Sequence, residues 1–228
     1  MYDKQTCHIC GQVAGDRSRD LISQVLGDRE YKRRAVLESE SFIVFPSIGP
    51  LITGHVLICP KAHVEGIAEI IGKLAKDYAE IKSATRKLLQ EVYGVGVHFF
   101  EHGGPAGSER PICSVGHAHM HAVPANVDIL GKLLDEGAWI SLRHHEVDLP
   151  SFCGDAEYLY YETPGGESYG CLGNHAAIAS QYMRRVFADA LGCPEMWNWR
   201  TDPRAEQLAE TANVLSAAAQ RRRLGLAA

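Results

Sequence analysis

The chain has 228 residues, of which 46% are hydrophobic and 22% charged, proportions that are ordinary for a globular protein. Its net charge of -5 provides no basic field for non-specific binding to nucleic acid, and no stretch approaches the roughly 20 apolar residues of a membrane span. The first residues lack the pattern of a signal peptide, and the seven cysteines are irregularly spaced. We therefore expect a cytoplasmic protein with neither a nucleic-acid nor a membrane partner.

Hydrophobic patterning predicts a mixture of strands and helices. Apolar runs predict strands over 34–46, 55–59, 95–101 and 117–123. Helical spacing of apolar residues predicts a long helix over 68–93 and shorter ones over 129–136, 176–191 and 203–222. Two aromatic segments flanking Pro164-Gly165-Gly166 predict a hairpin. Because the strands are too widely separated for a regular βαβ series, we predict an α+β fold with an antiparallel sheet.

Three histidines alternate along one predicted strand, in the order His117-Ala118-His119-Met120-His121. Alternate residues of a strand share a face, so the three imidazoles are expected to form a row while Ala118 and Met120 face a core. A neutral imidazole is a nucleophile near neutral pH and is also a common metal ligand. The alternation alone therefore favours either nucleophilic chemistry or a metal site.

Three motifs, in this order along the chain, together resemble the histidine triad (HIT) family. Cys7-x-x-Cys10 resembles the N-terminal pair of zinc-bearing members, residues 54–63 (GHVLICPKAH) resemble the G-H-x-L-x-x-P-K-x-H signature, and residues 117–123 resemble the triad pattern. The resemblance implies a HIT-like antiparallel sheet with a long helix, usually in a homodimer. It also implies hydrolysis or transfer of nucleotides through a nucleotidyl-histidine intermediate.

The resemblance assigns chemical roles around the triad. It implies that His119 is the nucleophile on the α-phosphorus, that His121 supports the phosphate, and that Ser114 contacts the phosphate or the leaving group. The hydroxyl of Ser114 is able to donate a hydrogen bond to developing charge. The backbone carbonyl of His117, or a nearby group, is expected to orient His119.

The chain departs from the family pattern at places that contact substrate. Ser47 stands where many members carry an acidic residue that holds the ribose, and Cys113 replaces a glutamine before the triad. Glu101 stands where an asparagine is usual, and the run Glu101-His102-Gly103 resembles a larger-bodied branch of the family. We therefore predict substrate contacts from Ser47, Glu101 and His102, with dinucleoside polyphosphates slightly favoured over nucleoside phosphoramidates.

A structural zinc ion is the expected cofactor. Cys7 and Cys10 have the spacing of a metal knuckle, and thiolates with imidazoles suit tetrahedral Zn²⁺. In the zinc-bearing relatives, the remaining two ligands correspond to His63 and His117. The resemblance thus implies that Cys7, Cys10, His63 and His117 are metal ligands. The alternative is that the cysteines are ordinary thiols near a polar terminus.

The resemblance to the family core ends near residue 125, so we divide the chain into a HIT-like catalytic domain, 1–140, and a C-terminal extension, 141–228. The extension carries arginines beside tryptophans, residue types that suit phosphates and bases respectively. We expect it to pack on or near the active site, with Arg184 and Arg200 binding substrate. The alternative is a solvated arginine face and tryptophans that only pack.

The sequence as a whole predicts a nucleotide hydrolase or nucleotidyltransferase. A phosphorylase is equally compatible with the triad, because water, phosphate or a sugar phosphate can attack the same intermediate. The alternative from another class is a nucleotide-binding, zinc-stabilised interaction module with little turnover, against which the intact His119 argues. A metallohydrolase in which all three triad histidines bind metal is a further alternative.

Overall fold

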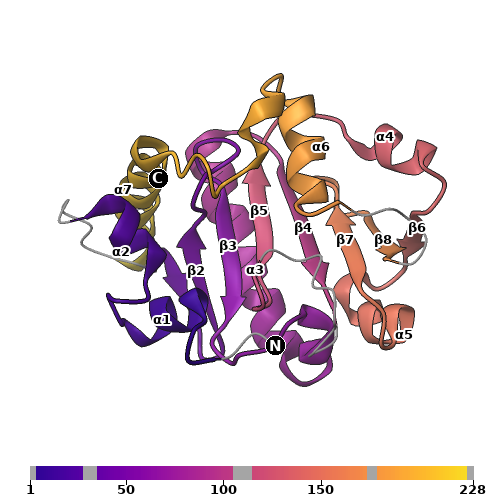
Figure 1. The fold of residues 1–228 in the computed structure, drawn as a ribbon, viewed down its shortest axis with the longest axis horizontal. Helices are drawn as coiled ribbons and strands as arrows, with labels where there is room; N and C mark the ends of the chain where they lie inside the picture. Colours follow the sequence, from indigo (N-terminus) through magenta and orange to yellow (C-terminus); the bar gives the residue numbers. More distant parts are fainter. Residues whose placement is uncertain (1–3, 28–34, 105–114, 174–178, 225–228) are drawn as a thin grey trace.

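The computed structural model describes residues 4–27, 35–104, 115–173 and 179–224 (Figure 1). Within these residues the strands form a single antiparallel sheet in the order β1-β2-β3-β5-β4-β7-β8-β6. The strands are β1 (Leu37–Glu38), β2 (Phe42–Pro46), β3 (Val56–Pro60), β4 (Val97–Gly103), β5 (Met120–Pro124), β6 (Ile140–Leu142), β7 (Tyr158–Glu162) and β8 (Ser168–Leu172). The predicted α+β class with an antiparallel sheet is confirmed.

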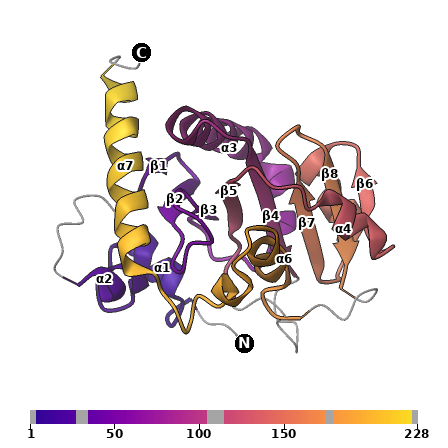
Figure 2. The same cartoon turned by 90° about the horizontal axis from the view of Figure 1, so that it is seen from above.

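Helices cover both faces of the sheet. They are α1 (His8–Ala14), α2 (Leu21–Leu26), α3 (Ile71–Tyr93), α4 (Leu130–Asp135), α5 (Leu149–Cys153), α6 (Tyr182–Ala190) and α7 (Ala205–Arg223), with short 3-10 turns at Ile67–Glu69, His145–Asp148 and Pro194–Trp197. The long helix α3 lies on one face, whereas α6 and the N-terminal helices lie on the other (Figure 2). The candidate site lies on the face opposite α3.

Packing of α3 on the sheet explains which face of β5 is apolar. Apolar side chains recur along α3, ending before Gly94, whose left-handed φ of 67° stops the helix. Met120 and Ala122 of β5 are fully buried in the same cluster. Since neighbouring strand residues point to opposite faces, His121 is directed away from α3.

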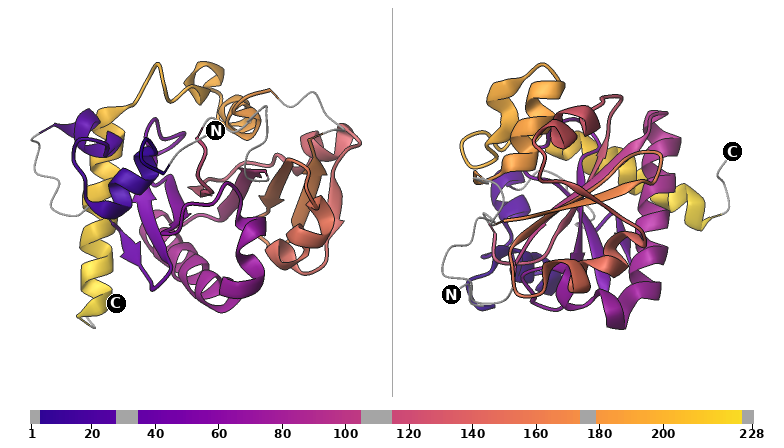
Figure 3. Two further views of the ribbon diagram at one scale, coloured as in Figure 1. Left: turned by 60° about the horizontal axis from the view of Figure 1, so that its bottom comes forward. Right: turned by 90° about the vertical axis from the view of Figure 1, so that its right-hand side faces the viewer.

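The C-terminal part of the chain continues the sheet beyond β4. Strand β7 pairs with β4, with Phe100 opposite Tyr161, and β7 and β8 form the predicted hairpin. The views in Figure 3 show the hairpin extending the twisted sheet and α6 standing on the face opposite α3. The sheet runs across residue 140. The division of the chain into two domains at that residue stays a prediction.

One helix was not predicted from the sequence, and one strand begins later than predicted. The polar N-terminal segment forms α1, which Cys7 caps by accepting a hydrogen bond from the backbone N–H of Cys10 at 3.4 Å. The strand expected over 117–123 begins only at Met120, because the N–H of Ala118 donates to the carbonyl of Val64. Among the described residues, no helix has the length and apolar character needed to cross a membrane.

Candidate active site and metal site

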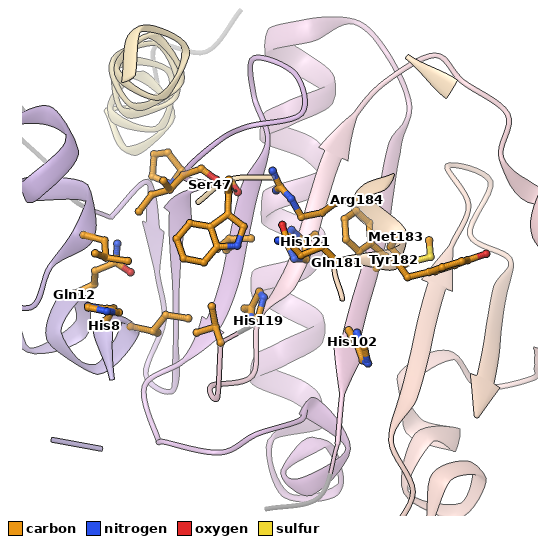
Figure 4. Close-up of a pocket in the computed structure, with 18 residues that line it drawn as sticks. His8, Gln12, Ser47, His102, His119, His121, Gln181, Tyr182, Met183 and Arg184 are labelled. Carbon is orange, nitrogen blue, oxygen red and sulfur yellow. Dashed lines mark hydrogen bonds between the residues drawn. The ribbon is translucent and has the colours of Figure 1, made fainter. Parts of the chain in front are cut away.

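A pocket opens on the face of the sheet that carries His119 and His121 (Figure 4). It contains about 860 Å³ of empty space, part of it open to solvent. Its walls come from the triad segment, from the loop after β2, from α1 and from the C-terminal part of the chain. The C-terminal residues that line it are Gln181, Tyr182, Met183, Arg184 and Trp199.

His119 is held in one tautomer by the main chain. Its Nδ1 lies 2.7 Å from the carbonyl oxygen of His117, which can only accept a hydrogen bond. Burial lowers the pKa of His119 below its ordinary value. The hydrogen bond to the His117 carbonyl raises the pKa, and the charge of Arg184 lowers it. The neutral ring therefore carries its proton on Nδ1, and Nε2 keeps a lone pair available to a ligand in the pocket.

A second chain of hydrogen bonds fixes the tautomer of His121. The N–H of Leu51 donates to Nδ1 of His55 at 3.2 Å, so neutral His55 carries its proton on Nε2. That nitrogen lies 2.8 Å from Nδ1 of His121. Burial lowers the pKa of both imidazoles well below the ordinary value, which keeps them neutral. His121 therefore accepts a hydrogen bond at Nδ1. Its Nε2 carries the proton and is the ring nitrogen that can donate to a ligand in the pocket.

Arg184 places a buried positive charge in the pocket. The residue is only 4% exposed, and its guanidinium donates to the carbonyls of Trp197 and Gly49. Within the described part of the chain, no carboxylate forms an ion pair with it. Burial and the charge of Arg204 lower the pKa of Arg184 to about 9, so it stays charged at neutral pH. A buried cation without an anion is costly, and an anionic ligand would remove that cost.

The other predicted substrate contacts differ in position. Ser47 and His102 line the pocket; burial and the nearby His119 lower the pKa of His102 to about 4, and its Nε2 has no partner among the described residues. Glu101 does not line the pocket, because its carboxylate accepts hydrogen bonds from Ile67 N–H and Tyr158 O–H on the side of α3. Arg200 is exposed and lies over the Trp199 ring rather than in the pocket. Ser114 lies outside the described residues.

The four predicted metal ligands come together beside the pocket. One ligand atom from each of Cys7, Cys10, His63 and His117 lies within 4.8 Å of all the others. Sγ of Cys10 is 3.3 Å from Nδ1 of His63 and 3.5 Å from Nδ1 of His117. Tetrahedral zinc with ordinary bond lengths separates sulfur and nitrogen ligands by about 3.5 Å, so the donor set fits that ion.

The surroundings of His117 also suit a metal ligand. Its Nε2 lies 2.9 Å from the carbonyl oxygen of Pro60, so this nitrogen carries the proton and Nδ1 is free to coordinate. Burial and the neighbouring Cys7 raise the pKa of Cys10 to about 12, as expected for two thiols packed together without a cation. His117 thus lies in the cluster of possible metal ligands and His119 in the pocket, and the His117 carbonyl joins the two.

The family model of the HIT domain matches residues 28–127, a range that includes the triad and the 54–63 motif. The chain therefore carries a HIT domain. Cys7 and Cys10 lie before the matched range, and the pocket residues Gln181, Arg184 and Trp199 lie after it. Two of the four clustered side chains and one wall of the pocket thus lie outside the matched range.

Relatives of this HIT domain also match part of the chain. "Protein hit" of Bacillus subtilis is 27% identical over 125 residues, which cover 54% of this chain and 74% of that protein. An uncharacterized HIT-like protein of Borreliella burgdorferi is 29% identical over 110 residues, covering 46% and 75% respectively. A crystal structure of a HIT family member from Bacillus subtilis shares 28% identity, covers 46% of this chain and 71% of its own, and has a TM-score of 0.35.

Sequence analysis did not assign several residues that line the pocket of the HIT domain. His8 and Gln12 come from α1, which has no clear periodicity in the sequence. Gln181 was visible only as part of a predicted helix beside Arg184, with no motif of its own. The role of His55 in orienting His121 was within reach, since His55 belongs to the 54–63 motif, but its partner is set by the pairing of β3 with β5.

Proposed function

We propose that the protein is a nucleotide hydrolase or nucleotidyltransferase that attacks an α-phosphorus through His119. The observation that carries this proposal is the geometry of His119, whose Nδ1 proton is bound by the His117 carbonyl and whose Nε2 is left as a nucleophile in the pocket. The HIT domain supports a nucleotide as the substrate. The buried, unpaired charge of Arg184 supports a substrate that is anionic.

The reaction would proceed in two displacements. In the first, the Nε2 lone pair of His119 forms a bond to phosphorus while the bond from phosphorus to the leaving group breaks. A polyphosphate leaves as an anion, and the amine of a phosphoramidate takes a proton from solvent as it leaves. The positive charge that develops on the ring is shared through Nδ1–H with the carbonyl of His117. In the second, water or another acceptor attacks phosphorus, the N–P bond breaks, and the acceptor loses its proton to solvent.

Two neighbouring groups are suited to stabilise the negative charge of the phosphoryl oxygens. The Leu51-His55-His121 chain leaves an Nε2–H donor on His121, and Arg184 adds a full positive charge from the side of α6. Fixed donors in a water-excluding site are more effective than mobile ones, because they need no reorganisation during the reaction. We propose Ser47 and His102 as further substrate contacts, and Ser114 as a contact to the phosphate or leaving group.

We propose that Cys7, Cys10, His63 and His117 hold a structural Zn²⁺. With four protein ligands such an ion has no open position, so its contribution is to fix α1 and His117 in place. The proposed substrates are dinucleoside polyphosphates or nucleoside phosphoramidates, with water, phosphate or another acceptor in the second step. A cytoplasmic location and a homodimeric assembly stay predictions from the sequence.

The test is to trap the covalent intermediate. The protein is incubated briefly with a nucleotide labelled at the α-phosphate, and a phosphohistidine-type adduct is identified by its lability to acid and stability to base. The wild type should form the adduct and turn over at least one substrate in a panel of phosphoramidates and dinucleoside polyphosphates, with and without phosphate. His119→Ala should do neither. Turnover that survives in His119→Ala, or a wild type without adduct or turnover, would contradict the proposal.

A further inference from the structure

Gln181, at the start of α6, has an unusual combination of properties. The residue is 9% exposed and lines the same pocket as His119. Its Nε2 lies 3.4 Å from Oδ1 of Asn198, which orients the amide, while its Oε1 is buried and has no hydrogen-bond partner among the described residues. The side chain makes no capping hydrogen bond to its helix. An unused buried acceptor therefore remains at the wall of the pocket.

The backbone of Gln181 is strained as well. Its φ of 59° and ψ of 31° are left-handed, a conformation that residues with a Cβ rarely adopt. Arg204 has a similar φ of 50°, but its guanidinium donates to the carbonyl of Pro50 and so has a structural use. Strain and an unsatisfied acceptor both oppose folding, and such costs collect at ligand sites. Within the described chain, no hydrogen bond to Oε1 of Gln181 offsets these costs.

The neighbourhood of Gln181 indicates which part of a substrate would meet it. Figure 4 shows Gln181 and Arg184 next to His121, with His8 and Gln12 at the opposite end of the pocket and His119 between them. Arg184 and His119 line this same pocket, so the guanidinium lies on the same side of the sheet as the triad. An acceptor and a cation thus lie together on one side of the nucleophile.

We propose that Oε1 of Gln181 accepts a hydrogen bond from a hydroxyl or amino group of the substrate, beside a phosphate bound at Arg184. This inference rests on the proposed function and deepens it by naming a residue that recognises a donor group of the substrate. A nucleotide combines phosphate with hydroxyl or amino donors, so the proposed ligand is a nucleotide that carries such a donor close to the phosphate at Arg184.

The experiment compares Gln181→Met, which keeps the length of the side chain but removes the acceptor, with wild type. The substrates are diadenosine tetraphosphate, its 2′-deoxy counterpart, and a counterpart with purine in place of adenine. For the substrate that carries the recognised donor, kcat/KM should fall about 5- to 150-fold, the range for leaving a buried donor unpaired. For the analogue that lacks this donor, wild type and variant should have equal kcat/KM. The analogue for which this holds shows whether the donor is a hydroxyl or an amino group. Gln90→Met, at an exposed position of α3, is the matched control.

A second variant separates recognition from folding. Gln181→Gly removes the acceptor and also relieves the left-handed strain, so it should raise Tm by about 2–4 °C. Its kcat/KM should fall as in Gln181→Met, and only for the substrate that carries the recognised donor. Equal losses for all three substrates, or no loss in either variant, would overturn the inference. The adduct test with His119→Ala decides the proposed function separately. Should wild type bind these nucleotides without turnover, that function fails, and the same ratios measured as Kd still decide the role of Gln181.

Discussion

The Nε2 of His55 lies 2.8 Å from Nδ1 of His121, although 66 positions separate the two residues in the sequence. Pairing of β3 with β5 creates this contact, because Leu57 lies opposite His121 and His55 immediately precedes β3. Since Leu51 N–H occupies the other nitrogen of His55, the direction of the hydrogen bond is fixed. His55 is therefore a positioning residue that determines which nitrogen of His121 carries the proton.

Replacing His55 should lower activity through His121. His55→Ala removes the donor to Nδ1 of His121 and lets its proton occupy either nitrogen, so kcat should fall roughly 10- to 100-fold, less than complete loss of a transition-state donor costs. His55→Gln should restore much of the rate, because a glutamine can accept from Leu51 N–H and donate to His121. Nitrogen NMR of the His121 ring is the accompanying measurement. A protonated Nε2 that persists in His55→Ala would contradict this account.

The metal site gives a prediction about composition and stability. Purified protein should contain one zinc ion per chain, and Cys10→Ser should lose the ion and unfold at a lower temperature, because metal binding contributes directly to folding. Elemental analysis and thermal unfolding, with and without chelator, measure both effects. Cys193→Ser is the control, since Cys193 lies at the start of the turn Pro194–Trp197 and outside the cluster. Full zinc content in Cys10→Ser would contradict the assignment.

Loss of the metal should also weaken nucleotide binding. Helix α1 carries Cys10 and also supplies His8 and Gln12 to the wall of the pocket. Releasing α1 from His63 and His117 would free this wall, so Kd for a nucleotide should rise in the chelated protein. A chelated protein that stays folded and binds nucleotide with unchanged Kd would show that α1 is held by packing alone.

Arg184 should contribute to binding of the substrate's negative charge. Arg184→Met keeps the apolar stem but removes the cation, so KM for an anionic nucleotide should rise about 10- to 100-fold, as for hydrogen bonds to charged groups. The control is Arg185→Met, because Arg185 stacks on Trp197 and does not line the pocket. Unfolding curves of both variants check for lost contacts to Gly49. A KM that is unchanged in Arg184→Met, with the fold intact, would refute this role.

The sequence predicted those features that depend on local pattern. The alternation of His119 and His121, the long helix and the hairpin follow from residue periodicity, and the ligand set was inferred from motif resemblance. The structure shows that folding brings Cys7 and Cys10 to His63 and His117. Neither the order of the strands nor the partner of His55 is encoded in a local pattern.

Features set by tertiary partners were not predictable. Arg184 and Arg200 both lie in the C-terminal extension, yet only packing places the first in the pocket and the second at the surface. Glu101 stands where the resemblance predicts a substrate contact. Hydrogen bonds from Ile67 and Tyr158 instead hold its carboxylate on the side of α3, outside the pocket. The left-handed backbone of Gln181 has no signal in its residue type.

The position of Glu101 leads to a prediction about pH. Burial raises its pKa from 4.5 to about 7, against the lowering effect of the hydrogen bonds from Tyr158 and Ile67. A carboxyl with a raised pKa binds its proton more tightly in the folded state, so its contribution is most favourable below about pH 4.5 and is lost as the pH rises through 7. Between these limits the free energy of unfolding should fall by about 3 kcal/mol from this group alone.

Glu101→Gln isolates this contribution, because the amide keeps the size of the side chain and does not titrate. Chemical denaturation of both proteins at several pH values between 4.5 and 8 gives the difference in their free energies of unfolding, in which the other titrating groups cancel. Wild type should lose stability relative to Glu101→Gln as the pH rises, with most of the change complete near pH 8. Two parallel curves would mean that Glu101 titrates at its ordinary pKa and that water reaches its carboxylate between Ile67 and Tyr158.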